Sequence, residues 1–426
     1  MLDIKLIRSD PEMVKAAIRK REMELDATVD EILDIDARRR SLTGQTEALK
    51  AEQNAASKQI PQLKKEGGDV AGLMARMKEL SARIKEEDAA LTALEEKQKE
   101  LLLCLPNLPD PDLESGGKEN NKPVRVFGEQ PQFDFPLKNH VELCESLGLI
   151  DYERGAKIAG NGSWIYRGLG ARMEWALLNF FVNEHLNDGY ELILPPHMLG
   201  YECGYVAGQF PKFEDEVYWI QNPTSSDRRF MLPTAETALV NLHRGEILTE
   251  ADLPRKYIAY TPCYRREAGS YRAEERGMIR GHQFNKVEMV QYTAPEASDE
   301  AFAELVGKAE RLVQELGLHY RLSKLAAGDC SFSMARTYDI EVWIPSMGIY
   351  KEVSSASNAR DYQARRGNVK VRGADGKLRL AHTLNASGLA TSRVMPAIVE
   401  QYQNADGSVT VPEVLRPYMG GVEVIR

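Results

Sequence analysis

The chain lacks the features that would place it in a membrane or outside the cell. No apolar run approaches the roughly 18 residues that a transmembrane helix needs. Charged residues interrupt the first ten positions too often for a secretory signal. With 43% hydrophobic and 28% charged residues, the 426-residue chain has the composition of a globular protein of two or three domains. We therefore expect a cytoplasmic protein that does not use a membrane.

Metal-binding and dinucleotide-binding motifs are also missing. The five cysteines never have the CxxC spacing, and the seven histidines form no HxxxH pair, so we expect neither disulfides nor a zinc site. The sequence contains no GxGxxG or GxxxxGKS/T element, which argues against a Rossmann site or a P-loop. The net charge of −9 argues against nucleic-acid binding over the whole surface but leaves room for a local basic face.

The segment from about residue 28 to 105 is rich in Ala, Glu, Lys, Leu and Arg. Its second half has a heptad pattern, with spacings that alternate between four and three, and its first half has a weaker apolar stripe. Pro61 and the Gly67-Gly68 pair lie between the halves and predict a break in the helix. Two helices that each carry one apolar seam predict an antiparallel coiled coil. The heptad positions are Leu73, Met77, Leu80, Ile84, Glu87, Leu91, Leu94, Gln98, Leu101 and Leu105.

The charge of this predicted hairpin is uneven. Residues 38–85 contain eleven Lys or Arg against five Asp or Glu, a net of +6, whereas acidic residues dominate both ends of the segment. The outer part is therefore a candidate surface for a polyanion. The alternative is that these charges are simply solvated positions on the outside of a coiled coil.

A turn-rich stretch, residues 106–123, separates the hairpin from a longer region that alternates strands with helices. Residues 172–185 have an amphipathic helical pattern, and residues 190–196 read as a short strand that ends at two prolines. Residues 338–344 alternate as a strand does. We predict an α+β fold with a mainly antiparallel sheet flanked by helices. The predicted domains are residues 1–110 and 111–426.

The most informative segment runs from Cys263 to Glu288. An apolar strand ends at Arg265, a charged loop with glycines follows, and a second strand carries Phe284, Lys286 and Glu288 at alternate positions, hence on one face. An arginine could neutralise a phosphate, an aromatic ring could stack on a base, and a carboxylate could hold an ammonium group. The alternative is an ordinary polar hairpin.

Three further segments combine small, hydroxyl and charged residues. Thr234 and Glu236 lie two residues apart before a predicted helix, and Glu352 and Ser355 lie three apart. Residues 383–393 form a strand of small residues that runs into a helix, with an arginine at the junction. Each segment alone is weak evidence for catalysis, but their order along the chain, together with the hairpin, is informative.

In this order the segments resemble class II aminoacyl-tRNA synthetases, and specifically seryl-tRNA synthetases of the bacterial type, over essentially all of the chain. The dimer-forming helix and strand of motif 1 are similar to the predicted helix at 172–185 and the strand that ends at Pro195-Pro196. The hairpin 264–288 is similar to motif 2, and residues 384–401 are similar to motif 3. The resemblance implies an N-terminal coiled-coil hairpin that binds tRNA, followed by a class II catalytic domain.

The resemblance also implies roles for individual residues. Arg265 would bind the α-phosphate of ATP and Phe284 would stack on the adenine, while Arg393 would hold the γ-phosphate. Glu352 and Ser355 would face a Mg²⁺ ion on the phosphates. The catalytic residues would be Arg265 and Arg393. The remaining predicted ATP-binding residues are Arg266, Glu267, Val353 and Ser354, and the predicted serine-binding residues are Thr234, Ala235, Glu236, Glu288 and Ser387.

The activity that the resemblance implies is that of a serine–tRNA ligase, which uses ATP, L-serine and tRNA(Ser), and also tRNA(Sec), as a homodimer. One alternative is a paralogue that loads an amino acid onto a carrier protein, but such proteins lack a full tRNA-binding hairpin. Another is an inactive tRNA-binding or scaffold protein, which would have lost Arg265, Glu288 or Arg393. All three residues are present.

Overall fold

The structure, a computed structural model, describes residues 1–221, 226–267 and 277–426. These residues divide into two compact units. One unit comprises Leu2–Arg19 and Met23–Pro106, and the other comprises Met1, Lys20–Glu22 and Asn107–Arg426. The domain boundary at residue 110 stays a prediction, because a compact unit and an independently folding domain are different things.

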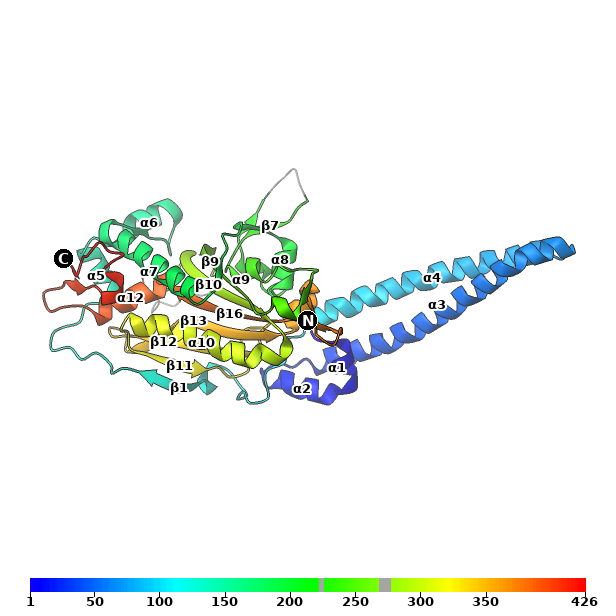
Figure 1. Ribbon diagram of the computed structural model, residues 1–426, viewed down its shortest axis with the longest axis horizontal. Coiled ribbons are helices and arrows are strands. Elements are labelled where there is room, and N and C mark those ends of the chain that lie inside the picture. The colour runs from blue at the N-terminus through cyan, green and yellow to red at the C-terminus, as the bar shows by residue number, and fades with distance from the viewer. Residues whose placement is uncertain (222–225, 268–276) are drawn as a thin grey trace. The chain divides into compact units, whose positions relative to one another are not determined.

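The N-terminal unit consists of four helices, of which the last two are long. Thr46 donates a hydrogen bond to Glu87 at 3.1 Å, and Gln53 donates one to Ser81 at 2.5 Å. Residue numbers rise along one helix while they fall along the other, so the two helices run antiparallel (Figure 1). The helices are α1 (Ile4–Ser9), α2 (Pro11–Arg19), α3 (Asp26–Glu66) and α4 (Val70–Leu103).

The heptad predicted for the second long helix is confirmed by its burial. All ten positions are buried or half-buried, with Leu80, Ile84 and Gln98 among the buried ones. At 1.5 Å per residue, α4 is roughly 50 Å long. An isolated helix of such mixed polarity is marginal in water, so the apolar seam between α3 and α4 is what stabilises both.

The predicted helix break is confirmed at the Gly67-Gly68 pair, but the break predicted at Pro61 is wrong. Pro61 lies inside α3, which continues to Glu66. A proline inside a helix removes one hydrogen bond and its ring clashes with the preceding turn, at a cost of about 3 kcal/mol, and the helix continues past it in spite of this cost. The helix ends where Gly67 adopts a left-handed conformation with φ of 69°, and the N–H of Gly67 binds the carbonyl of Leu63.

The second unit is built on an eight-stranded sheet whose neighbours are antiparallel except for one parallel pair, β4 with β9. The α+β class and the mainly antiparallel sheet are therefore confirmed. The strands, in spatial order, are β1 (Lys122–Phe127), β11 (Tyr320–Lys324), β12 (Arg336–Ile344), β13 (Ile349–Arg360), β16 (His382–Ala390), β10 (Gln283–Thr293), β9 (Arg255–Tyr264) and β4 (Glu191–Leu192).

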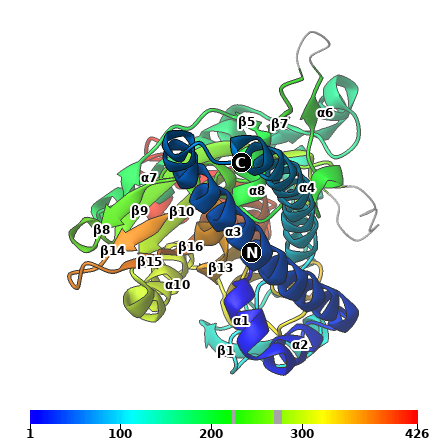
Figure 2. The same ribbon diagram turned by 90° about the vertical axis from the view of Figure 1, so that its right-hand side faces the viewer.

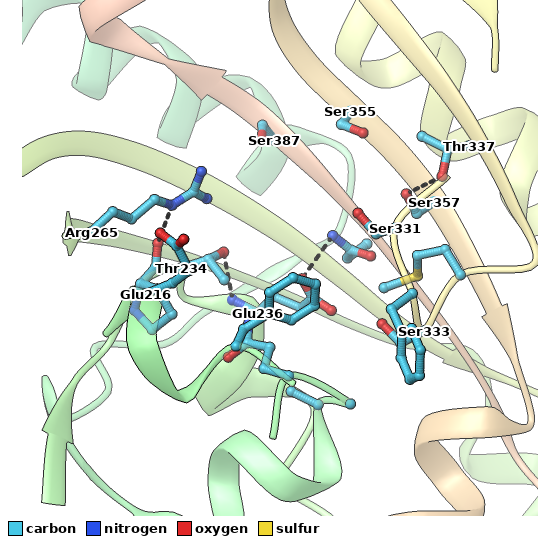
Figure 3. Close-up of a pocket in the computed structure, with 18 of the residues that line it drawn as sticks. Glu216, Thr234, Glu236, Arg265, Ser331, Ser333, Thr337, Ser355, Ser357 and Ser387 are labelled. Atoms are coloured by element: carbon cyan, nitrogen blue, oxygen red, sulfur yellow. Dashed lines mark hydrogen bonds between the residues drawn. The ribbon is translucent and has the colours of Figure 1, made fainter. Parts of the chain in front are cut away.

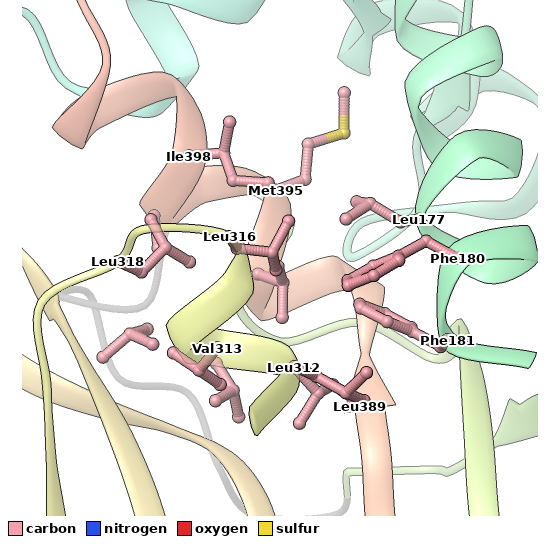
Figure 4. Close-up of a cluster of buried hydrophobic side chains, with 14 of the residues drawn as sticks. Leu177, Phe180, Phe181, Leu312, Val313, Leu316, Leu318, Leu389, Met395 and Ile398 are labelled. Carbon is pink, nitrogen blue, oxygen red and sulfur yellow. The ribbon is translucent and has the colours of Figure 1, made fainter. Parts of the chain in front are cut away.

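The two faces of this sheet differ in chemistry because its central strands alternate apolar and polar residues. In β16, Leu384 and Ala386 belong to the hydrophobic core, while Asn385 and Ser387 line a cavity on the other face. The core face is covered by α7 (Gly168–Asn187), α10 (Ser298–Glu315) and α12 (Thr391–Gln401). Figure 4 shows side chains of these three helices meeting, among them Phe180, Phe181, Leu312, Leu316, Met395 and Ile398.

Shorter elements surround the sheet. A separate three-stranded sheet is formed by β15 (Leu378–Leu380), β14 (Lys370–Arg372) and β8 (Ile247–Thr249) (Figure 2). The strand predicted over residues 190–196 is shorter than expected, since only β4 pairs there before the two prolines. None of the helices in the described ranges is both long and apolar enough to cross a lipid bilayer.

Candidate active site

A cavity of about 490 Å³ lies on the polar face of the sheet. Its walls come from β10, β13 and β16 and from the segment that leads into α9 (Glu236–Leu239). Figure 3 shows Thr234, Glu236 and Arg265 on one side of it, and the hydroxyl groups of Thr337 and Ser357 on the other. A smaller cavity of about 40 Å³ shares Arg265 and four other residues with the first. The two cavities together form one polar site.

Two buried carboxylates face this cavity. Glu288 is fully buried in β10, and Glu236 is the first residue of α9. The side-chain amide of Asn385 donates to Glu288 at 3.1 Å and to Glu236 at 3.4 Å, and so connects the two. Gln363 donates to the other oxygen of Glu236 at 2.8 Å. Amide donors thus fix both carboxylates without cancelling their charges.

Lys286 and Thr234 complete this end of the site. Lys286 forms an ion pair with Glu288, and its ammonium group donates to the hydroxyl of Thr234 at 2.9 Å. The Thr234 hydroxyl in turn lies 3.4 Å from the Glu288 carboxylate. One lysine therefore faces two carboxylates, and this leaves a net negative charge at this end of the cavity.

The excess negative charge affects Glu236 in particular. Burial, and after it the nearby charge of Glu288, raises the pKa of Glu236 to about 7. A carboxyl group with such a pKa is half protonated near neutral pH. An ammonium group bound beside it would favour the ionised form.

The other end of the site presents guanidinium groups and an aromatic ring. Arg265 lies over the ring of Phe284, with 5.2 Å between its guanidinium carbon and the ring centroid, and it donates to the carbonyl of Pro233 at 3.2 Å. Arg393, in the first turn of α12, donates to the carbonyl of Glu352 at 3.0 Å. Two cations beside an aromatic ring suit a base with a polyphosphate.

Glu352 and Ser355 reach the same cavity because β13 contains a bulge. Ile340 pairs with Ser354 but the next residue, Glu341, pairs with Glu352, so Val353 is an extra residue in the ladder. Without it, two residues three apart would point to opposite faces. Asp339 lies opposite Ser355, and burial, followed by the charge of Glu352, raises its pKa well above the ordinary value.

Most of the predicted site residues are brought together. Of the described residues, three predicted ones line neither cavity: Ala235 is fully buried in a hydrophobic cluster, Arg266 is exposed, and the Ser354 hydroxyl donates to the carbonyl of Ser387 at 2.6 Å. The charged loop predicted within motif 2 lies partly outside the described residues, at 268–276. The predicted residues that line a cavity are Thr234, Glu236, Arg265, Glu267, Phe284, Glu288, Glu352, Val353, Ser355, Ser387 and Arg393.

Several residues at the site have no role in the predictions from the sequence, among them Lys286, Asp339 and Gln363. Lys286 shares a face with Phe284 and Glu288, so the alternation that identified those two also pointed to it. Asp339 lies in the strand predicted over residues 338–344, but no motif near it in the sequence indicates a role in the site. Gln363 comes from α11 (Tyr362–Gly367), and nothing in the sequence connects it with Glu236.

Comparison with known proteins assigns the chain to a family. Residues 1–109 match the seryl-tRNA synthetase N-terminal domain, and residues 218–402 match the tRNA synthetase class II core domain (G, H, P, S and T). The serine–tRNA ligase 2 of Clostridium acetobutylicum is 62% identical over 99% of this chain and 99% of its own length. The chain belongs to the seryl-tRNA synthetases. It is therefore a member of a family of aminoacyl-tRNA ligases, as the motifs predicted.

Two solved seryl-tRNA synthetases share the fold. The enzyme of Pyrococcus horikoshii, crystallised with ATP, is 35% identical, with a TM-score of 0.94 over 100% of this chain and 99% of that one. The cytoplasmic enzyme of Naegleria fowleri, in complex with AMP, is 29% identical, with a TM-score of 0.88 over 100% and 99%. Within residues 1–221, 226–267 and 277–426, no cluster of three His, Cys, Asp or Glu side chains could hold a metal ion.

Proposed function

We propose that the protein activates L-serine with ATP to seryl-adenylate and transfers serine to the 3′ end of tRNA(Ser). The observation that carries this proposal is the pair of buried carboxylates, Glu236 and Glu288, at one end of a cavity whose other end carries Arg265, Phe284 and Arg393. The carboxylates suit the serine ammonium, and the cations and the ring suit ATP. The ATP and AMP complexes of the two relatives support the choice of an adenine nucleotide.

The arrangement accounts for both steps without a protein nucleophile. A serine carboxylate oxygen forms a bond to the α-phosphorus while the bond to pyrophosphate breaks. A ribose hydroxyl at the tRNA 3′ end then attacks the carbonyl carbon, and AMP leaves. Arg265 would bind the α-phosphate and stabilise the charge that develops there, and Arg393 would hold the γ-phosphate. Phe284 would hold the adenine, and Glu236 and Glu288 would hold the serine ammonium group. Together they would align the serine carboxylate with the α-phosphorus.

Mg²⁺ would bind at Glu352 and Ser355. Asp339 lies across the strand pair from Ser355, and its buried Oδ1 has no hydrogen-bond partner among the described residues. Carboxylate and hydroxyl oxygens are ligands that Mg²⁺ accepts, with phosphate oxygens and water completing its shell. When bound, the ion would neutralise phosphate charge.

Serine selectivity follows from the polar character of its pocket. Thr234, Glu236, Glu288 and Ser387 would surround the ammonium and hydroxyl groups. A pocket that hydrogen-bonds a substrate hydroxyl leaves buried groups unpaired when alanine enters, and the resulting discrimination against alanine can reach about 10⁴.

Residues 1–110 would form the tRNA-binding domain, and residues 111–426 would form the catalytic domain. A second substrate would be tRNA(Sec), which shares the acceptor chemistry.

We also propose that the enzyme is a cytoplasmic homodimer. Large apolar side chains lie exposed on and after α7, the helix of motif 1: Trp175 is 57%, Leu194 76% and Met198 56% exposed. A contiguous patch of exposed apolar side chains is typical of a protein–protein interface, and these three residues would contribute to one.

The first test is ATP–pyrophosphate exchange measured with each of the twenty amino acids, with Mg²⁺ and without tRNA. Exchange with serine alone is the expected result, because alanine lacks the hydroxyl that the pocket would bind and the size of the pocket would exclude the additional methyl group of threonine. Exchange with another amino acid would move the specificity to a paralogue, and no exchange with any of them would refute the proposed activity.

A second test uses the pKa of Glu236. Because the ammonium group of serine would bind beside the ionised carboxylate of Glu236, protonation of Glu236 below its pKa of about 7 opposes binding. We expect the KM for serine at pH 6 to be about tenfold higher than at pH 8. Steady-state exchange at saturating ATP measures it. Glu236→Gln is the control: its KM should be high at every pH, and an unchanged pH profile in that variant would assign the effect to another group.

A further inference from the structure

Glu174 is a buried carboxyl group that lines neither cavity. It lies on α7, is 4% exposed, and its Oε1 accepts hydrogen bonds from the Thr391 hydroxyl at 2.6 Å and from the Asn285 side-chain amide at 2.8 Å. The Thr391 hydroxyl also lies 3.2 Å from the carbonyl oxygen of Asn285. One carboxyl oxygen thus joins three elements, α7, β10 and α12.

The two donors are neighbours of residues that face the nucleotide end of the site. Asn285 stands between Phe284 and Lys286 in β10, and alternation turns it toward α7 while its neighbours face the cavity. Thr391 is the first residue of α12, and Arg393 follows two positions later. Glu174 therefore holds, from the opposite face of the sheet, both the strand that carries the aromatic ring and the helix turn that carries the guanidinium group.

The contacts of Glu174 are those of an acceptor rather than of an ion-pair partner. Both donors are neutral groups, and burial raises the pKa of Glu174 above its ordinary value. A glutamine side chain offers the same acceptor oxygen at the same place. A charge at this position is thus not required for the hydrogen bonds.

We propose that Glu174 is a positioning residue for ATP, which fixes Phe284 and Arg393 relative to each other through Asn285 and Thr391. This inference rests on the proposed function and extends it to a residue outside the cavities. A small displacement of the Phe284 ring or of the Arg393 guanidinium group would weaken nucleotide binding. The serine end of the site is built from Thr234, Glu236 and Asn385, which have hydrogen bonds of their own.

The experiment compares Glu174→Ala, Glu174→Gln and Thr391→Val by serine-dependent exchange. We expect Glu174→Ala to raise the KM for ATP about tenfold or more while the KM for serine stays within about twofold. Glu174→Gln should stay near the wild type because its oxygen accepts the same bonds. Thr391→Val, which conserves shape and removes one donor, should raise the KM for ATP less, and it provides the test if Glu174→Ala fails to fold.

The matched control is Glu400→Gln. Glu400 is also fully buried, lies on α12, and accepts hydrogen bonds from the His140 backbone at 2.8 Å and the Ser346 hydroxyl at 2.9 Å. It lines neither cavity, so its variant should keep the KM for ATP even if its melting temperature falls. A normal KM for ATP in both Glu174→Ala and Thr391→Val, or equal increases for ATP and serine, would overturn the proposal. Failure of the proposed function is seen separately, as absence of exchange in the wild type.

Discussion

Replacement of Arg265 by alanine is expected to reduce serine-dependent ATP–pyrophosphate exchange by about a thousandfold or more. Arg265 lines both cavities and lies over Phe284, where the α-phosphate of ATP would be placed between the base and the serine carboxylate. Negative charge grows on that phosphate as the carboxylate attacks. Loss of the guanidinium therefore raises the free energy of the transition state more than that of the bound ground state. As a result, kcat should fall by a larger factor than KM rises.

Two variants make this prediction specific. Arg265→Lys keeps the positive charge but loses the planar pair of donors, so it should recover only part of the lost rate. Arg255→Ala removes a half-buried arginine at the start of β9, the strand that ends just before Arg265. Its partner is Asp252 at 2.9 Å, and its loss should leave exchange unchanged. Wild-type exchange in a folded Arg265→Ala protein would refute the phosphate role.

The sequence predicted the polar face of the catalytic sheet because alternation is a local property. Phe284 and Glu288 lie two apart, and each step of two along a strand returns to the same face. In the structure, Glu288 lines the larger cavity and Phe284 lines the smaller one. The heptad from Leu73 to Leu105 is equally local, and its burial is confirmed as well.

Other features depend on contacts between distant segments, which no local pattern encodes. The joint orientation of Glu352 and Ser355 requires an extra residue at Val353, and that bulge is visible only in the pairing of β12 with β13. Gln363 reaches Glu236 across 127 positions of the chain. The break wrongly predicted at Pro61 has a different cause. The free-energy cost of one proline inside α3 is smaller than the stabilisation that the long apolar seam between α3 and α4 provides.

Removal of the outer part of the helical hairpin is expected to separate the two half-reactions. Arg38 and Leu94 line one depression between α3 and α4, so deletion of residues 38–94 with a short Gly-Ser link cuts both helices at the same level. Exchange should remain within about twofold of the wild type, because every cavity residue lies outside the deletion. Serylation of tRNA should fall by about a hundredfold or more, since the basic surface is lost. Loss of exchange in a folded deletion variant would refute the two-module interpretation.

A charge variant of the intact hairpin tests whether this loss comes from phosphate contacts. The exposed lysines Lys58, Lys64, Lys65 and Lys78 can be changed to glutamine without altering the apolar seam. Each phosphate contact releases counterions, so the slope of log affinity against log salt concentration should become shallower by about one per contact removed. The matched control changes the exposed acidic residues Glu86, Glu95 and Glu96 to glutamine, which should leave that slope unchanged or make it steeper. If both variants gave the wild-type slope, the basic charges would be solvated positions and tRNA would bind elsewhere.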